Sequence, residues 1–145
     1  MNRFEKTLVM LLRLAGVLLL TAVIPAVMPF AWMKDTHRLL GMGELPEGPI
    51  VGYLTRSLSA MYALHGGLLL FVSLDLRRYL PVAKCLAVLG IMFGVGMLVL
   101  DVTVGMPPPW AACEGPFIIV LSGVLLWLAG HVHEKPVPRS ANKGK

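Results

Sequence analysis

Four long apolar segments, separated by shorter polar stretches, dominate the chain. The first runs from about Leu8 to Trp32, and the others follow at about residues 55–74, 82–104 and 110–130. Each segment is close to the length of about 20 mostly apolar residues that a helix needs to cross a bilayer. The sequence therefore predicts an all-α, polytopic membrane protein: a bundle of four transmembrane helices.

The first apolar segment contains one charge and two prolines. Arg13 lies near its start, within reach of the membrane surface, where a long cationic side chain can snorkel into water. Pro25 and Pro29 each remove a backbone donor, so we expect the last third of this helix to be kinked or loosened. The apolar run is longer than the core of about 7–15 residues in a signal peptide, and we expect the helix to be retained.

The connection between the first two spans, about residues 33–54, is long for a link between packed helices. Glycines and prolines are frequent in it. Long loops tend to carry function, so we expect this one to cap the bundle, with a docking surface as the alternative. The four-helix domain should cover residues 1–134. Residues 135–145, rich in Lys, Arg and Pro, should form a disordered basic cytoplasmic tail.

Charge sets the expected orientation. Only 14% of the 145 residues are charged and 57% are hydrophobic, too few charges to cover a soluble domain. The net charge of +5 does not indicate nucleic acid, because the cations flank apolar runs instead of forming a basic face. Ten of the 13 Lys and Arg residues lie in the amino end, the second loop or the carboxyl tail. The positive-inside rule then predicts both termini in the cytoplasm, in a plasma membrane or cell inner membrane.

Three charged residues near the ends of predicted spans are candidate ligand-binding residues. Arg56 opens the second span, Asp101 closes the third, and Glu114 lies one turn into the fourth. Alternating helix directions put all three near the outer face. We expect Arg56 to pair with Asp101 or Glu114, since pairing relieves the cost of desolvation. A ligand or proton site under the first loop and simple interfacial solvation are the alternatives.

Small residues on the predicted helices indicate which faces pack. Asp101 shares a helical stripe with Gly90 and Gly94, whose spacing lets a neighbouring helix approach closely. Arg56 shares a face with Ala60, Ala63 and Gly67, which predicts a second packing stripe. These stripes direct Arg56 and Asp101 into the bundle.

His65, near the middle of the second span, is the deepest ionisable side chain, and Tyr62 lies one turn before it. A neutral histidine bonded to another helix is one interpretation. A proton relay or a polar contact for a lipophilic ligand is the other. A haem held by two histidines would need a second histidine at the same depth, and no other span has one.

The remaining motifs exclude several kinds of chemistry. Cys85 and Cys113 form no paired-cysteine motif, and the predicted topology separates them too far for a disulfide. His131 and His133 lie two apart and would point away from each other on a helix. With Glu134 they could bind a metal, but a solvated helix end explains them better. No nucleotide, hydrolase or metalloprotease motif is present, so we expect neither metal nor cofactor, and enzymatic activity stays open.

Two short segments, Glu114-Gly-Pro-Phe117 with Leu121-Ser-Gly123, and Leu64-His-Gly-Gly-Leu68, resemble small four-helix membrane proteins of the DoxX-like kind. The helix count and the chain length are similar as well. Some members of that group are associated with quinone or thiol oxidation systems. The resemblance implies a four-helix membrane fold and carries over no catalytic residue, and the missing paired-cysteine motif argues against thiol chemistry.

The sequence favours a non-catalytic function, an accessory or scaffold subunit of a membrane complex. The alternative is a binder or enzyme for a quinone- or sterol-like molecule that uses Tyr62, His65, Arg56, Asp101 and Glu114. A proton-coupled exporter is a weaker possibility, because such exporters rely on an acid within the first span. The expected partners are the lipid bilayer and either other membrane subunits or further copies of this chain, but not nucleic acid.

Overall fold

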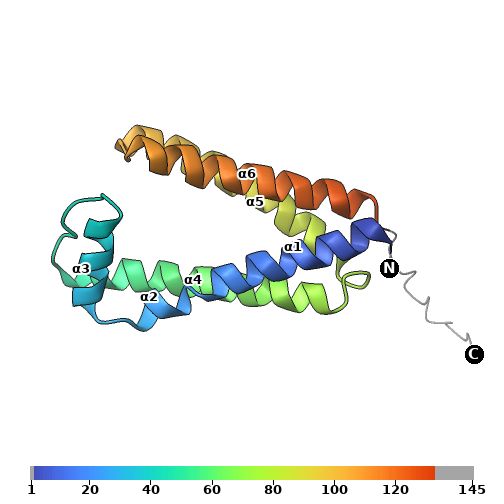
Figure 1. Ribbon diagram of the computed structural model, residues 1–145, viewed down its shortest axis with the longest axis horizontal. Helices are drawn as coiled ribbons and strands as arrows, with labels where there is room; N and C mark the ends of the chain where they lie inside the picture. The colour runs from blue at the N-terminus through green and yellow to red at the C-terminus, as the bar shows by residue number, and fades with distance from the viewer. Residues whose placement is uncertain (1, 133–145) are drawn as a thin grey trace, which may run out of the picture.

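The structure, a computed structural model, describes residues 2–132, which are helical with no strand. The helices are α1 (Arg3–Leu20), α2 (Val23–Val27), α3 (Phe30–Leu39), α4 (Pro49–Leu74), α5 (Leu80–Val104) and α6 (Pro108–Gly130) (Figure 1). Four segments of this part of the chain are long and apolar enough to cross a membrane: Arg3–Val27, Pro49–Leu74, Leu80–Val104 and Pro108–Gly130. The predicted all-α architecture with four spanning helices is confirmed. The expected tail at residues 135–145 lies outside the described residues.

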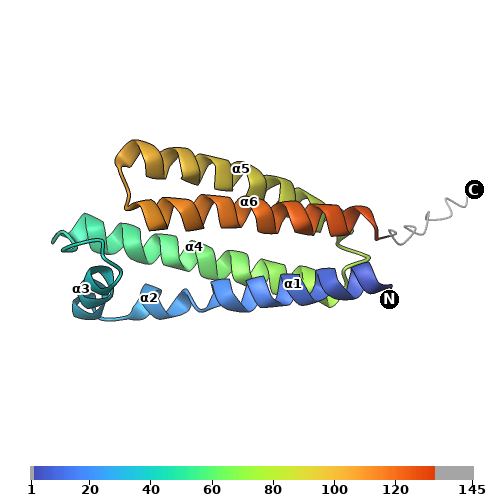
Figure 2. The ribbon, with the colours of Figure 1, turned by 45° about the horizontal axis from the view of Figure 1, so that its top comes forward.

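The first span is broken as its prolines predict. α1 ends at Leu20, a turn follows, and α2 ends at Val27. Met28 adopts an extended conformation with ψ 154°, because a residue directly before a proline is disfavoured in helical geometry. Pro29 then caps α3, a ten-residue helix that turns away from the α1 direction (Figure 2). The span therefore ends earlier than Trp32, its predicted end.

The other three spans begin with proline, which has no N–H to lose in the first turn of a helix. Pro49, Pro81 and Pro108 occupy the first or second position of α4, α5 and α6. α5 ends at Val104 and is capped by Gly105, which has a φ of +78° and whose N–H donates to the carbonyl of Asp101. A left-handed glycine at this position is a common helix stop, and it turns the chain back into α6.

Glycines bring the helices together in two pairs, α1 with α4 and α5 with α6. A Cβ atom added at Gly66 of α4 would lie 2.6 Å from the carbonyl oxygen of Gly16 in α1. A Cβ atom at Gly94 of α5 would lie 2.8 Å from Cγ1 of Ile119 and 3.0 Å from the carbonyl oxygen of Gly115 in α6. Such close approach is typical of small residues in membrane helices. The predicted glycine stripe of α5 is therefore a contact face.

The predicted small-residue face of α4 is right at Ala63, which is buried, and wrong at its other two small residues. Gly67 has no atom within 4 Å of an added Cβ, and Ala60 is exposed. The residues that α4 buries on this side are Ser59, Ala63 and Gly66. Adjacent helical positions differ by about 100° in direction, so a shift of one residue rotates the contact face away from Arg56.

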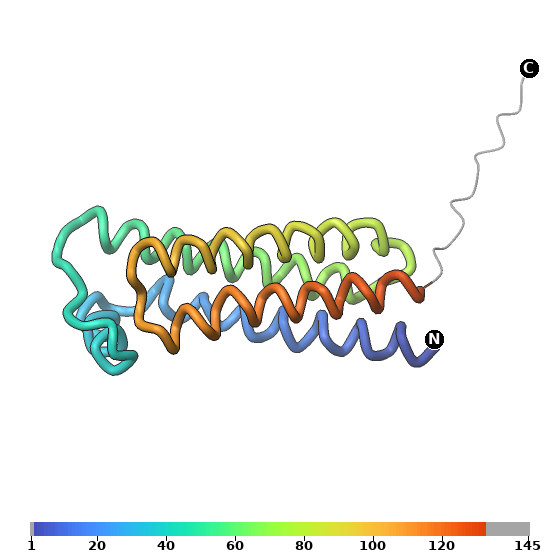
Figure 3. Tube along the Cα trace, turned by 90° about the horizontal axis from the view of Figure 1, so that it is seen from above, coloured from blue at the N-terminus to red at the C-terminus, as the bar shows by residue number. Residues whose placement is uncertain are grey.

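The two helix pairs join at one end and diverge at the other. We call the end with the amino terminus and Val132 the terminal end, and the opposite end, with α3 and Gly105, the loop end. At the terminal end α1, α4, α5 and α6 share one apolar core, which includes Leu8, Leu12, Leu69, Val72, Leu76, Leu80, Ala83, Ala87, Leu125, Leu128, Ala129 and Val132. Seen from above, α5 lies over α4 and α6 over α1 (Figure 3). Towards the loop end the pairs separate (Figure 1). The core therefore holds the two helix pairs together at the terminal end only.

An ion pair fastens the terminal end. Glu5 is buried, with 5% of its surface exposed, and accepts two hydrogen bonds from Arg77, of 2.8 and 2.9 Å. This links the first turn of α1 to the turn between α4 and α5. Phe4 also packs on the rings of Trp127 and His131, with centroids 5.7 and 4.9 Å away. Both contacts tie α1 to its neighbours where the core is densest.

Candidate functional site

The helix pairs touch mainly between α1 and α6, and to a smaller extent between α4 and α5. Two stripes of side chains, one on α4 and one on α6, lead from the shared core towards the loop end. Residues four, seven and eleven positions apart on a helix share one face. The α4 stripe consists of Leu58, Tyr62, His65, Leu69 and Val72, and the α6 stripe consists of Glu114, Ile118, Leu121, Leu125 and Leu128. Leu69 and Val72 of the first and Leu125 and Leu128 of the second are members of the shared core. Since each stripe continues along its helix, its remaining residues face the space between the pairs.

Burial along these stripes changes sharply from one end to the other. On α4, Leu69 and Val72 are 5% and 0% exposed, whereas Leu58 is 55% exposed. On α6, Leu125 is 8% exposed, whereas Ile118 and Glu114, nearer the loop end, are only partly buried. The stripes are thus closed by packing at the terminal end and partly or fully uncovered at the loop end, where the pairs diverge. In a membrane this uncovered part must be filled by lipid, ligand or another helix.

The polar members of the stripes lie in this uncovered part. Tyr62 is partly buried, and the carboxylate of Glu114 on α6 lies close enough to interact electrostatically with its phenol. His65, one turn further along the α4 stripe, is exposed, and no hydrogen bond from the described residues reaches its ring. Glu114 accepts a hydrogen bond from the indole N–H of Trp110, one turn earlier on α6. The structure thus places three of the predicted site residues, Tyr62, His65 and Glu114, on the stripes of α4 and α6 that continue the shared core.

Asp101 lies apart from this group. It is only 3% exposed and continues the stripe of α5 that packs on α6 through Gly94. Its Oδ2 atom has no hydrogen-bond partner within residues 2–132. Its depth and its direction into the bundle agree with the sequence, but it points into the α5–α6 contact and not towards α4.

The predicted pairing of Arg56 is wrong. Its guanidinium donates to the backbone carbonyl of Met28, at 3.1 Å, and in the described part of the chain it forms no ion pair with Asp101 or Glu114. The physical reason is the break before Pro29, which leaves the Met28 carbonyl without a helical partner close to the start of α4. Arg56 satisfies that carbonyl and remains exposed.

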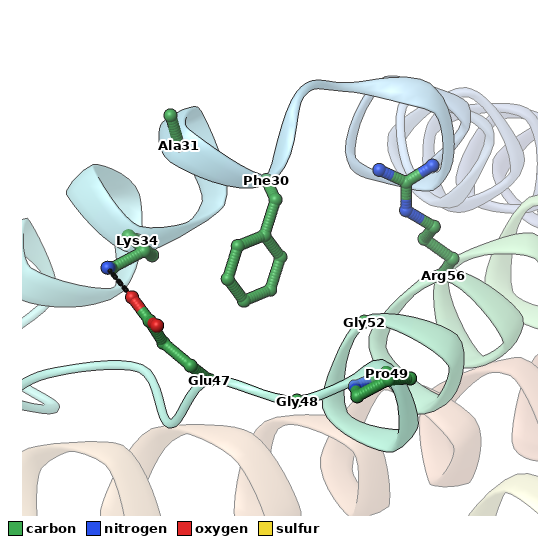
Figure 4. Close-up of a pocket in the computed structure, with 8 residues that line it drawn as sticks. All are labelled: Phe30, Ala31, Lys34, Glu47, Gly48, Pro49, Gly52 and Arg56. Carbon is green, nitrogen blue, oxygen red and sulfur yellow. Dashed lines mark hydrogen bonds and ion pairs between the residues drawn. The ribbon is translucent and has the colours of Figure 1, made fainter.

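Arg56 instead lines an open pocket at the loop end. The pocket has a volume of about 610 Å³ and lies between α3, the segment before α4, and the first turns of α4. Its lining residues are Phe30, Ala31, Lys34, Glu47, Gly48, Pro49, Gly52 and Arg56. Figure 4 shows the ring of Phe30 between the Lys34–Glu47 pair on one side and the Arg56 guanidinium on the other.

The Lys34–Glu47 pair closes one edge of this pocket. Nζ of Lys34 donates to Oε1 of Glu47 at 2.7 Å, with 33% and 78% of the two side chains exposed. The hydrogen bond from Lys34 lowers the pKa of Glu47 below its ordinary value, and the same contact raises the pKa of Lys34. Both groups are therefore charged over a wide pH range, and the pair joins α3 to the start of α4.

The structure offers no metal centre among the residues it describes, because no three potential ligands of the His, Cys, Asp and Glu types gather there. Cys85 and Cys113 are free and exposed. Nδ1 of His131 lies 2.8 Å from the carbonyl oxygen of Trp127. His133 and Glu134, the other members of the possible metal motif, lie outside the described residues.

Three features escaped the sequence reasoning. The contact between Glu5 and Arg77 spans 72 residues, and nothing in the local sequence signals it. The pocket residues Phe30, Lys34 and Glu47 come together only because the chain turns back after Pro29. By contrast, the Trp110–Glu114 contact could have been found, because residues four apart on a helix are neighbours.

Comparison of the chain with protein-family models, with curated proteins and with solved structures finds no match. The functional argument therefore rests on the residues and the geometry given above.

Proposed function

We propose that this protein binds a lipophilic small molecule between the diverging halves of its two helix pairs, with Tyr62, His65 and Glu114 as polar contacts. The observation that carries the proposal is that these side chains lie on the α4 and α6 stripes beyond the shared core, where the helix pairs diverge and packing does not fully cover them. A polar group without a partner inside a membrane is costly, and such groups mark functional positions by default. A ligand with a polar head would satisfy them.

The side chains indicate the chemistry of that ligand. The phenol of Tyr62 and the imidazole of His65 each donate and accept hydrogen bonds, whereas an ionised Glu114 only accepts. The leucines and aromatic rings around them offer apolar contact. A ring system that carries a hydroxyl or carbonyl group, such as a quinone or a sterol, matches this combination, because it places one polar edge among apolar surroundings.

The test is to identify what the purified protein retains. The chain is isolated in a mild detergent, extracted with organic solvent, and the extract is examined by mass spectrometry. We expect a lipophilic compound that is lost in His65→Leu and reduced in Tyr62→Phe. Thr103→Val is the matched control, because the hydroxyl of Thr103 bonds to the Leu100 carbonyl of its own helix. Retention that is equal in all four proteins would overturn the proposal.

An accessory or scaffold subunit of a membrane complex is the second candidate. It is favoured by Gly67, Gly96 and Gly123, three glycines in spanning helices at which an added Cβ would meet no atom within 4 Å. Small residues on uncovered faces allow another helix to pack closely. Co-purification of other subunits in fixed proportion, lost in Gly96→Leu, would favour this function over the ligand site.

For the location we infer a plasma membrane or inner membrane with both termini in the cytoplasm. The support is the excess of Lys and Arg at the terminal end. Reporter tags at either terminus should respond only to the cytoplasm, and a tag in the segment 44–49 should respond only to the outside. Labelling of a terminal tag by an impermeant reagent in intact cells would refute this orientation.

A further inference from the structure

The pocket at the loop end is a second site, separate from the helix stripes considered above. Its volume of about 610 Å³ falls within the range of small-molecule sites, about 300–1,000 Å³. It is built by three elements that meet only in the folded chain: α3, the 47–48 segment and the first two turns of α4. None of its residues belongs to the α4 or α6 stripe.

The charge of the lining favours an anion. Two cations, Lys34 and Arg56, and one anion, Glu47, line the pocket, which leaves a net charge of +1. A guanidinium has five N–H donors, and Arg56 makes one hydrogen bond, to Met28, within the described residues. Lys34 has three donors, and within the described residues it makes one hydrogen bond, to Glu47. Several charged donors therefore remain available on both sides of the pocket.

The position of the pocket indicates the source of the anion. α4 has 26 residues, so it is about 39 Å long, against about 30 Å for the hydrocarbon core of a bilayer. Placed at the loop end, the excess of about 9 Å brings the Cα atom of Arg56, about 10.5 Å from the start of α4, to the boundary of the hydrocarbon core, and its long side chain can reach the headgroups from there. The neighbouring α3 exposes Trp32, with 64% of its surface accessible, and tryptophan is enriched at this boundary.

Phe30 adds an apolar wall. Its ring lies between the Lys34–Glu47 pair and Arg56 (Figure 4), and its nearest ring carbons would lie 3.9 Å from a Cβ at Gly52. A ligand that fits this lining has a phosphate near the cations and a glycerol or acyl portion against the ring. Arg is suited to phosphate because its planar fork can donate two parallel hydrogen bonds to it.

We propose that the loop-end pocket binds the phosphate headgroup of an anionic membrane lipid, with Arg56 as its main ligand and Lys34 as the second. The contact with Met28 holds the Arg56 side chain at the pocket. Glu47 neutralises Lys34 in the empty site and, being 78% exposed, can turn into solvent when the phosphate arrives.

The test is a lipid titration of the full chain in a neutral detergent, read by native mass spectrometry and by melting temperature. We expect phosphatidylglycerol to bind and to raise the melting temperature, and phosphatidylcholine with the same acyl chains to have a much smaller effect. Since hydrogen bonds to charged groups are among the strongest in proteins, Arg56→Gln should weaken phosphatidylglycerol binding about tenfold or more. Lys34→Gln should weaken it less.

Two further variants make the result specific. Arg56→Lys keeps the charge and should retain part of the binding, which separates ligand binding from a loss of folding. Arg38→Gln is the matched control: Arg38 lies on the same α3, pairs with Asp35 at 3.2 Å, and does not line the pocket. It should bind as the unmodified chain does.

The outcomes that overturn the proposal are distinct from a failure of the ligand site on the stripes, because neither Tyr62 nor His65 is altered. Equal binding of the two lipids would show that charge is not recognised. Equal loss in Arg38→Gln and Arg56→Gln would show a diffuse surface effect in place of a site. If inorganic phosphate alone raised the melting temperature as much as phosphatidylglycerol, and Arg56→Gln removed that effect, the ligand would be a soluble phosphate and the lipid assignment would fail.

Discussion

Replacing Gly66 by Ala should loosen the α1–α4 pair. An added Cβ would lie 2.6 Å from the carbonyl oxygen of Gly16 and 2.7 Å from the backbone nitrogen of Leu20. Ordinary contacts are near 3.5 Å, so the two helices would have to separate by roughly 1 Å. Overpacking typically costs about 1–3 kcal/mol. We expect the upper end of that range, because both clashing atoms belong to the backbone and neither can rotate away.

The helix itself offsets part of this cost. Ala is better than Gly in a helix interior by about 1 kcal/mol, so the net destabilisation of Gly66→Ala is about 2 kcal/mol. The adjacent variant Gly67→Ala meets no atom within 4 Å and keeps only the gain. The two variants have the same composition and differ in position by one residue. They should therefore differ by about 3 kcal/mol in the free energy of unfolding.

The assay is thermal unfolding in detergent, followed by tryptophan fluorescence. For a chain of this size, 2 kcal/mol corresponds to a fall of roughly 4–8 °C in melting temperature. Gly67→Ala should melt at or slightly above the temperature of the unmodified chain. The reasoning is refuted if Gly67→Ala is the less stable of the two, since α4 would then contact α1 through the face that the sequence pattern indicated.

Three further predictions concern packing and charge. Gly94→Leu should lower the melting temperature more than Gly130→Leu, because only the first position faces atoms closer than 3 Å; equal melting would remove the close α5–α6 contact. Glu5→Gln should lower the free energy of unfolding by about 1–3 kcal/mol, because it removes the negative charge that accepts two hydrogen bonds from Arg77. An unchanged melting temperature would mean that these bonds do not contribute to stability. The Lys34–Glu47 contact should stabilise the loop above the ordinary Glu pKa of 4.5 and below the ordinary Lys pKa of 10.5. That stabilisation should disappear as pH falls through the lowered pKa of Glu47 or rises through the raised pKa of Lys34. Limited proteolysis of residues 40–48 should accordingly be faster at both extremes than at neutral pH, and a flat profile would contradict it.

The sequence by itself determined the spans and their interruptions. Whether a segment crosses a membrane depends on the summed hydropathy of about 20 neighbouring residues, which is written in the local sequence. Pro29 likewise restricts the residue before it through local sterics, so the break at Met28 followed from two adjacent residues of the sequence. The close approach at Gly94 was also readable, because the Gly90–Gly94 spacing is a property of one helix.

Only the tertiary structure decided which faces meet. The choice between Gly66 and Gly67 is a rotation of α4 by one position, and both glycines fit a small-residue pattern equally well. That rotation is set by the partner helix and not by α4 alone. The same rotation places Tyr62, on the α4 stripe, near the carboxylate of Glu114.

The charged residues show the same division. The sequence indicated that Arg56 and Asp101 lie at similar depth and that a partner or a function must offset the cost of placing their charges in a membrane. Depth alone does not determine which partner each one has. Arg56 took the carbonyl of Met28, which the broken first span had exposed nearby, while Asp101 was enclosed between α5 and α6. Partner choice depends on distances between segments far apart in the chain, and these exist only once the helices have packed.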